Sequence, residues 1–290
     1  MRVCLYYNET AGEGTRADDI SGLITNAGHH VARVVRRDDA RSSHLSEGVD
    51  AVVVAGGDGT VANASRMLAG GRIPLAILPL GTANNIATAL GIDARLETAV
   101  AAWARQRVVH IDVGVVEDRR GHCYFIEGVG VGLIPEGINA SRTMVSKETV
   151  PSPEDRLEQA RQIFRETLQD LQPRRYGVRI EGESIDNDAL LVEVLNITTV
   201  GPRIRLSPDA NPADGLLSVV IAGPADRDAI ASHLRSPWDD DDSHARLRSW
   251  RARRIEVTGW HDYHVDDDVR SAEGETVTIR VEPGFLPVLA

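Results

Sequence analysis

The chain has 290 residues, of which 42% are hydrophobic and 26% are charged. That composition is typical of a folded protein with one large or two ordinary domains. The formal net charge of -11 and a pI of about 5.3 argue against a general nucleic-acid binder and against electrostatic docking on an anionic membrane. Cys4 and Cys123 each lie in an apolar run, which indicates buried thiols rather than a disulfide or a zinc site. Because neither a signal peptide nor an apolar stretch of bilayer length is evident, we expect a cytoplasmic protein.

Short apolar runs alternate with amphipathic segments in the first part of the chain. Strands that alternate with helices predict a parallel sheet covered on both faces. The predicted strands span 2–7, 30–35, 50–55 and 74–78, and the predicted helices span 16–27, 86–90 and 94–105, with another helix after Thr60.

Three loops follow predicted strands of this sheet, at 8–12, 56–60 and 81–85. The carboxyl ends of parallel strands lie at one edge of a sheet, and ligands bind beyond that edge. We therefore expect the three loops to converge on one crevice.

Residues 51–60, AVVVAGGDGT, lead from a buried strand into a glycine-rich turn and then into an amphipathic helix. The glycines allow a ligand to approach the main chain, and the N-terminus of the helix favours an anion. Asp58 lies in the middle of this turn and would repel a phosphate unless a cation or a proton in transit accompanied it. The pattern favours phosphoryl transfer over simple anion binding, with an ordinary Gly-Asp-Gly turn as the alternative.

After residue 107, short strand-like runs are separated by Gly, Pro and Asp, which predicts a mostly antiparallel β domain. One helix interrupts it after Ser152, which is a good N-cap. We expect the apolar stripe of this helix to pack on its own domain, with a rim for an apolar substrate as the alternative. Residues 127–132, EGVGVG, allow close approach of either a strand or the substrate. The predicted strands of this part span 108–116, 123–129, 176–180, 189–196, 216–222, 254–257 and 276–281.

Four motifs occur in order along the chain: VVVAGGDGT, LPLGTANNIATALGI, ADGLLSVVI and HVDDD. Together they resemble the diacylglycerol kinase catalytic family, the bacterial lipid kinases that include sphingosine-kinase-like enzymes. The resemblance implies an α/β nucleotide-binding domain with an NAD-kinase-like parallel sheet and a mostly-β, sandwich-like domain for the lipid substrate. We place these domains at 1–109 and 110–290, with the extreme C-terminus as a candidate to pack back on the first domain.

The resemblance also implies which residues bind ATP. The loop at 8–12 is the loosest match, because it keeps only the Asn and the Gly of the family pattern NPxSG. The implied nucleotide-binding residues are Asn8, Gly12, Gly56, Gly57, Asp58, Gly59, Thr60, Gly81, Thr82, Asn84 and Asn85.

Acidic residues near the C-terminus resemble the family's V-D-G-E motif. This implies that Asp266 or Asp268 is the base that deprotonates the lipid hydroxyl. Asp58 is the third predicted catalytic residue, because of its place in the glycine-rich turn. The adjacent His261 and His264 are interpreted as surface residues and left out of the site.

The segment around Asp214 resembles the family's DGxLDV motif. In some members this segment holds a structural magnesium ion, which implies a site here made of Asp214 and the carbonyls of Asn211 and Leu216. An ordinary Asp-Gly turn is an equal alternative.

Taken together, these motifs predict an ATP- and Mg²⁺-dependent kinase that phosphorylates a hydroxyl of diacylglycerol or a related lipid alcohol. An NAD-kinase-like phosphotransferase is one alternative. A catalytically weak nucleotide-binding relic is another, because Asn63, Asn85 and Ser218 stand where the family commonly has carboxylates. We expect a lipid partner, transient contact with a membrane surface and no nucleic acid, and a homodimer is an open alternative.

Overall fold

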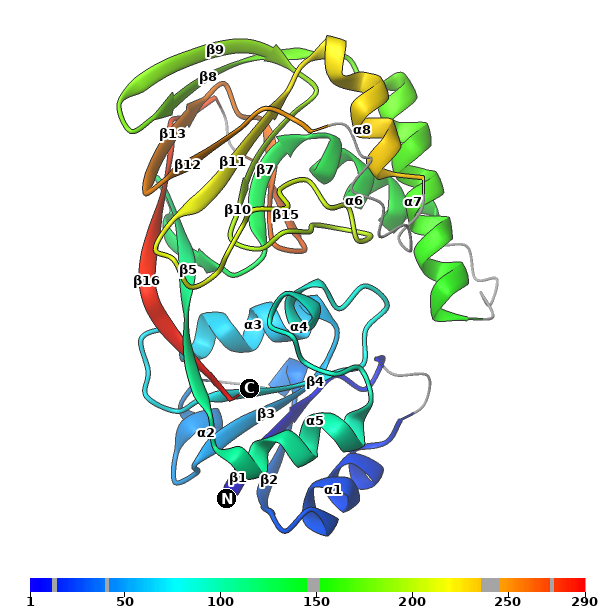
Figure 1. The fold of residues 1–290 in the computed structure, drawn as a ribbon, viewed down its shortest axis with the longest axis vertical. Helices are drawn as coiled ribbons and strands as arrows, with labels where there is room; N and C mark the ends of the chain where they lie inside the picture. The colour runs from blue at the N-terminus through cyan, green and yellow to red at the C-terminus, as the bar shows by residue number, and fades with distance from the viewer. Residues whose placement is uncertain (12–14, 40–41, 145–151, 236–245, 272–273, 290) are drawn as a thin grey trace. The chain divides into compact units, whose positions relative to one another are not determined.

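The computed structural model describes residues 1–290 except 12–14, 40–41, 145–151, 236–245, 272–273 and 290. The chain forms two compact units (Figure 1). The first unit consists of Met1–Val113 and Pro283–Ala290, and the second consists of Gly114–Glu282. The end of the last strand thus belongs to the first unit.

The first unit contains a parallel sheet in the order β2-β1-β3-β4. Its inner strands are almost entirely buried, because helices cover both faces and leave no polar side. The strands are β1 (Arg2–Tyr7), β2 (His30–Arg36), β3 (Ala51–Gly56) and β4 (Leu75–Pro79), followed at the edge by the end of β16 (Val277–Leu289).

Alternate residues of β1 face different helices. Leu5 packs in a cluster with Ile20 of helix α1, whereas the hydroxyl of Tyr6 donates to Asn63 of helix α3 at 2.9 Å. This alternation follows from the pleat of a strand. The helices of the unit are α1 (Ala17–Asn26), α2 (Ser42–Ser46), α3 (Asp58–Leu68), α4 (Asn85–Ala89) and α5 (Leu96–Ala102), with 3-10 turns η1 (Arg37–Asp39) and η2 (Trp103–Arg105).

The second unit is built from antiparallel strands in two layers. One layer has the order β12-β11-β10-β7-β14-β15, and the other pairs β16 with β13, β13 with β8 and β8 with β9. Apolar side chains of both layers form one core. The strands are β6 (Gly121–Phe125), β7 (Gly128–Gly132), β8 (Arg174–Ile180), β9 (Glu183–Ala189), β10 (Leu191–Leu195), β11 (Leu217–Ala222), β12 (Ser249–Ala252), β13 (Arg254–Thr258), β14 (Asp262–Val265) and β15 (Asp268–Ser271), together with the second half of β5 (Val108–Asp118), whose first half belongs to the first unit.

Helices α6 (Leu133–Met144), α7 (Pro153–Asp170) and α8 (Arg227–His233), with the 3-10 turn η3 (Pro224–Asp226), complete the second unit. The Ser152 hydroxyl accepts the amide of Asp155 at 3.1 Å, which confirms the predicted N-cap. Phe164 and Leu168 of α7 pack in the unit's second core cluster. The apolar stripe of α7 therefore packs on its own domain, as expected.

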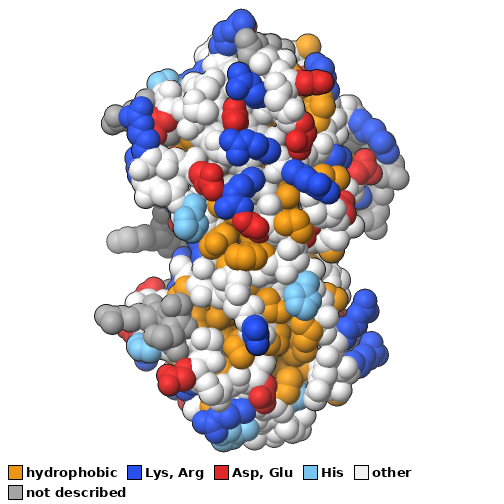
Figure 2. Space-filling view, turned by 90° about the vertical axis from the view of Figure 1, so that its left-hand side faces the viewer, with side chains coloured by type: hydrophobic (Ala, Val, Ile, Leu, Met, Phe, Trp, Pro, Cys, Tyr) orange, Lys and Arg blue, Asp and Glu red, His pale blue; other side chains and the backbone are white. Residues whose placement is uncertain are grey.

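The predicted fold class, an α/β domain followed by a mostly-β domain, is confirmed. Some elements differ from the predictions: the expected strand at 123–129 is two strands, β6 and β7, and helices α2, α6 and α8 and strands β9, β12, β14 and β15 were not predicted. None of the helices in the described part of the chain is both long and apolar enough to cross a membrane. On the face drawn in Figure 2, basic and acidic side chains are interspersed.

Candidate functional site

Three loops begin side by side at the carboxyl edge of the parallel sheet. Tyr7 pairs with Ala55, and Gly56 pairs with Pro79, so β1, β3 and β4 end at nearly the same level. The amide of Asn8 donates to the Ala55 carbonyl at 3.2 Å, and the amide of Leu80 donates to the Gly56 carbonyl at 3.0 Å. The loops that follow these strands thus start from neighbouring points, as the alternation of strands and helices predicted.

The second and third loops touch through glycine backbone. A β-carbon placed on Gly57 would lie 3.0 Å from the Cα of Gly81, and one placed on Gly81 would lie 2.5 Å from the Cα of Gly57. Only residues without a side chain allow this approach. Gly57 is also the N-cap residue of α3, so the contact lies beside the amides at the start of that helix.

The Asp58 carboxylate joins the same two loops. Its Oδ1 accepts the amide of Ile86 at 3.0 Å, and the amides of Asn84 and Asn85 also hydrogen-bond to it. Burial raises the pKa of the Asp58 carboxyl, and these amide donors oppose the shift. The sequence interpretation required a cation or a mobile proton beside Asp58, whereas in the structure backbone amides at the start of α4 stabilise the carboxylate.

Two asparagines shape the loops from within. Asn84 adopts a left-handed conformation (φ 51°), and its side chain both accepts from the Gly81 amide at 2.9 Å and donates to the Gly81 carbonyl at 2.8 Å. Asn8 accepts the amide of Thr10 at 3.2 Å and its hydroxyl at 2.9 Å. These side chains hold the loop backbones in place, which is the requirement for a site built from main-chain amides.

The remaining predicted nucleotide-binding residues have different surroundings. Thr60 is buried, and its side chain lies where a β-carbon on Gly56 would be. Gly59 and Thr82 are partly exposed, and Asn85 is buried. Gly12 lies outside the described residues.

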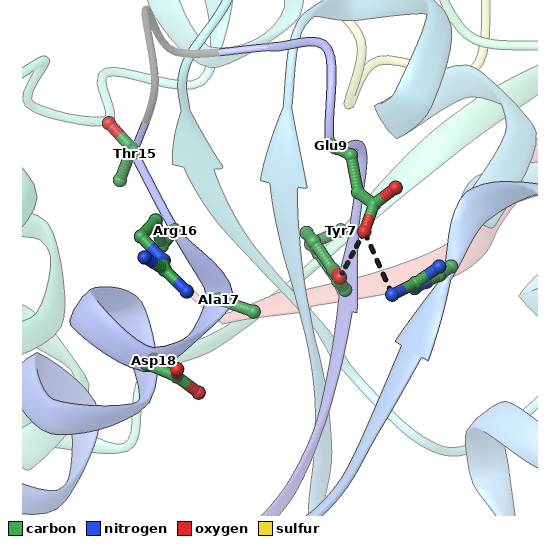
Figure 3. A pocket seen from close by; sticks show the side chains of 7 residues that line it. Tyr7, Glu9, Thr15, Arg16, Ala17 and Asp18 are labelled. Carbon is green, nitrogen blue, oxygen red and sulfur yellow. Dashed lines mark hydrogen bonds and ion pairs between the residues drawn. The ribbon is translucent and has the colours of Figure 1, made fainter.

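A hollow of about 400 Å³ lies beside the first loop (Figure 3). Glu9 accepts from the hydroxyl of Tyr7 at 3.0 Å and pairs with Arg36 at 3.1 Å, and Arg16 and Asp18 lie on the opposite wall. The hollow thus has walls of mixed charge. Its polar residues were not among the sequence-predicted site residues.

The acidic motif near the C-terminus forms the turn between β14 and β15. Asp266 is buried, and its Oδ1 accepts the amides of Ile126, Glu127 and Gly128 at 3.2, 2.9 and 3.4 Å. Asp268 begins β15 and is half-buried. The two candidate bases therefore differ: one carboxylate is anchored to backbone amides, and the other lies nearer to the surface.

Two of the three proposed magnesium ligands, the Asp214 carboxylate and the Leu216 carbonyl, contact an arginine side chain instead. One guanidinium nitrogen of Arg251 contacts the Asp214 carboxylate and lies 3.3 Å from the Leu216 carbonyl. The other donates to the Asp209 carbonyl at 2.7 Å and to the Ser218 hydroxyl at 2.9 Å. Because a guanidinium cation already lies between the Asp214 carboxylate and the Leu216 carbonyl, these two oxygens are not arranged to hold a Mg²⁺ ion.

Sequence reasoning missed Arg251, and it misjudged the surroundings of His264. His264 is fully buried, whereas the expectation was a surface residue; His261 is exposed as expected. The partner of His264 is Glu193, an acid in the otherwise apolar strand β10. A lone charged residue in such a run was the available signal, since it needs a buried partner.

We predict that Gly81→Ala lowers the free energy of unfolding by about 1–3 kcal/mol, because its methyl group would overlap the backbone of Gly57. Denaturant unfolding would measure the change. Gly22→Ala is the matched control, since a β-carbon there meets no atom within 4 Å and alanine favours a helix by about 0.5–1 kcal/mol. An unchanged stability of Gly81→Ala would contradict the close contact.

We predict that Arg251→Met lowers the free energy of unfolding by about 1 kcal/mol, since it removes the cation between Asp214 and Leu216. The melting temperature of the original protein should not respond to EDTA or Mg²⁺. Arg254→Met is the control, because Arg254 forms an exposed pair with Glu256 and the change in charge is the same. A melting temperature of the original protein that falls in EDTA would show that a metal is bound after all.

Two family models match the chain. The "Diacylglycerol kinase catalytic domain" matches residues 2–116, and the "YegS C-terminal NAD kinase beta sandwich-like domain" matches residues 133–290. Similar curated proteins include a "Probable lipid kinase YegS-like" of Klebsiella pneumoniae, 29% identical over 83% of this chain and 78% of the relative. A "Diacylglycerol kinase" of Mycobacterium tuberculosis is 29% identical over 76% of this chain and 73% of the relative.

Solved structures share the fold. A diacylglycerol kinase from Bacillus anthracis superposes with a TM-score of 0.75 at 20% identity, over 99% of this chain and 96% of that chain. An NAD kinase from Archaeoglobus fulgidus in complex with ATP superposes with a TM-score of 0.57 at 13% identity, over 100% of this chain and 94% of that chain. With both parts of the chain matched by family models, the protein belongs to the diacylglycerol kinase catalytic-domain family of lipid kinases.

Proposed function

We propose that the protein is an ATP-dependent lipid kinase that transfers the γ-phosphate to a hydroxyl of diacylglycerol or a related lipid alcohol. The observation that carries this proposal is the contact between the turns at Gly57 and Gly81, at the start of α3. Backbone amides at a helix N-terminus that a ligand can approach closely are suited to phosphate groups. Membership of the lipid kinase family supports a lipid alcohol as acceptor.

The nucleotide phosphates would lie against the amides of Gly57 and Gly59, with Thr82 and Asn8 at the neighbouring loops. Asp58 would act mainly by holding the second loop against the third, because its carboxylate hydrogen-bonds to the amides at 84–86. Mg²⁺, when bound with ATP, would neutralise charge on the β- and γ-phosphates.

We place the base for the lipid hydroxyl in the acidic turn of the second unit, as the family resemblance implies. The Asp266 or Asp268 carboxylate would accept the hydroxyl proton while the lipid oxygen forms its bond to the γ-phosphorus and the bond to the β-phosphate oxygen breaks, which releases ADP. Transfer to a lipid would bring the protein into transient contact with a membrane surface.

The alternatives make different predictions for the same assay. An NAD-kinase-like enzyme would phosphorylate NAD, and a relic would bind ATP without turnover. The relic alternative draws on Asn63, Asn85 and Ser218, which stand where the family commonly has carboxylates. Each of them has a defined role in the structure. Asn63 accepts from the Tyr6 hydroxyl, Asn85 is buried and its amide hydrogen-bonds to Asp58, and Ser218 accepts from Arg251. Those contacts do not require carboxylates.

We predict that purified protein transfers labelled phosphate from ATP to diacylglycerol, or to another alcohol in a lipid extract, presented in mixed micelles. NAD and sphingoid bases are assayed in parallel, and thin-layer chromatography identifies the labelled product. Labelling of NAD alone would contradict the proposal, and so would saturable ATP binding without transfer to any lipid.

We predict that one of Asp266→Asn and Asp268→Asn lowers kcat by about 10²–10⁴-fold, since loss of a general base removes that factor, while the other has a much smaller effect. Asparagine keeps the acceptor oxygen that Asp266 offers to the amides at 126–128, so the fold is preserved. Initial rates and melting temperatures would be measured together. Full activity of both variants would place the base elsewhere.

We predict that Asp58→Asn lowers both the melting temperature and the transfer rate, because a neutral amide replaces a carboxylate that accepts backbone amides at the start of α4. The expected loss of stability is about 1.5–3 kcal/mol, typical of hydrogen bonds to a charged group. Calorimetry would measure it. Unchanged stability would mean that these hydrogen bonds do not hold the two loops together.

A further inference from the structure

Three residues lie in a row across the sheet beside the acidic turn. Glu193 of β10 pairs with Gly130 of β7, and Gly130 pairs in turn with His264 of β14. A β-carbon on Gly130 would lie 2.3 Å from the Cδ and Oε1 of Glu193. The glycine therefore leaves the space in which the side chains of Glu193 and His264 meet across the middle strand. The close approach expected at 127–132 is thus that of a neighbouring strand.

The pair is completely enclosed. Both side chains are 0% exposed, and the Nε2 of His264 lies 2.9 Å from the Oε2 of Glu193. The Nδ1 of His264 lies 2.8 Å from the carbonyl oxygen of Asp266. Because a carbonyl can only accept, Nδ1 carries a proton, and a second proton is shared between Nε2 and the Glu193 carboxylate.

Burial lowers the pKa of His264, but the neighbouring Glu193 raises it, and the net shift is upward. Burial raises the pKa of Glu193, and the opposing effect of His264 does not cancel this rise. Both shifts favour retention of the shared proton, so His264 can donate to Asp266 and to Glu193 at once. The imidazole is therefore held at both ends, and its ring has a fixed orientation toward the turn.

The residue that receives this hydrogen bond has an unfavourable backbone conformation. Asp266 has φ 54°, in the left-handed region that costs free energy for a residue with a side chain. Its amide donates to the Gly128 carbonyl at 2.8 Å, and its Oδ1 accepts the amides at 126–128. The His264 contact fixes the remaining backbone group, the carbonyl.

A buried Glu–His pair contributes little stability beyond what apolar side chains of the same size would give. Glu193 also keeps a buried Oε1 for which the described residues supply no hydrogen-bond partner, which costs further free energy. Packing alone therefore does not account for the pair, and its contact with the Asp266 turn is the feature that an apolar pair would lack.

We propose that Glu193 and His264 are positioning residues that hold the Asp266–Asp268 turn in the conformation required for phosphoryl transfer, with Gly130 providing the space for them. The inference rests on the proposed function for its catalytic consequence, but the conformational part is independent of it. Neither residue touches the reacting atoms; both act through the carbonyl of Asp266.

The test separates positioning from packing. Glu193→Leu combined with His264→Leu fills the space with apolar groups and removes the donor to Asp266, so the melting temperature should stay close to that of the original protein. kcat should fall by about 10²-fold, as expected for a displaced catalytic group, whereas the KM for ATP should not change. Glu193→Gln can donate its amide N–H to Nε2 of His264 while Nδ1 keeps its proton for the Asp266 carbonyl, so this single variant should retain most of kcat. An unchanged kcat in the double variant would overturn the proposal.

Hydrogen exchange gives a readout that needs no substrate. In the double variant, exchange should become faster in the peptide that covers 262–271, because the Asp266 amide loses its fixed geometry, and stay unchanged in β11. Val220→Ala, which creates a cavity at a fully buried position of β11, is the control for general destabilisation and should not show this local effect. Unchanged exchange at 262–271 would overturn the inference even if the protein proves to be a kinase. Faster exchange in a protein without lipid kinase activity would refute the proposed function alone.

Discussion

The first unit's site depends on the contact between two turns that are far apart in sequence. Gly57 and Gly81 approach so closely that neither position can accept a side chain without displacing the other's backbone. The carboxylate of Asp58 reinforces the contact by accepting amides at the start of α4. The glycine-rich turn that resembles a phosphate loop therefore also holds the second loop against the third. Backbone amides of the protein stabilise the Asp58 carboxylate at its centre.

The same principle recurs in the second unit, where a glycine makes room for a polar contact. Gly130 allows Glu193 and His264 to meet across a strand, and their hydrogen bond reaches the strained turn at Asp266. Near the start of β11, Arg251 bridges oxygens for which the family resemblance implied a metal ion. In each case a side chain of the chain itself fixes a loop that carries candidate functional groups.

Much of the fold could be predicted, because continuous apolar runs with clear turns identify strands. The strand at 2–7 was predicted with its observed bounds. The strand predicted at 50–55 is observed at 51–56, so each end was placed one residue too early. The run at 123–129 was predicted as one strand because it is mostly apolar; the break at Ile126 and Glu127 depends on Asp266, which lies far away in sequence. The alternation of strands and helices predicted that the loops converge. It could not predict the partners of His264 and Arg251, because those contacts join strands that are distant in sequence.

The central claim is that the touching turns at Gly57 and Gly81 bind the phosphates of a nucleotide. Selective ¹⁵N labelling of glycine, followed by titration with ATP, tests it most directly. The account predicts saturable shifts of the amide signals of Gly57, Gly59 and Gly81, while the signal of Gly22 in α1 stays in place. ATP binding that leaves the three loop signals unmoved would contradict it.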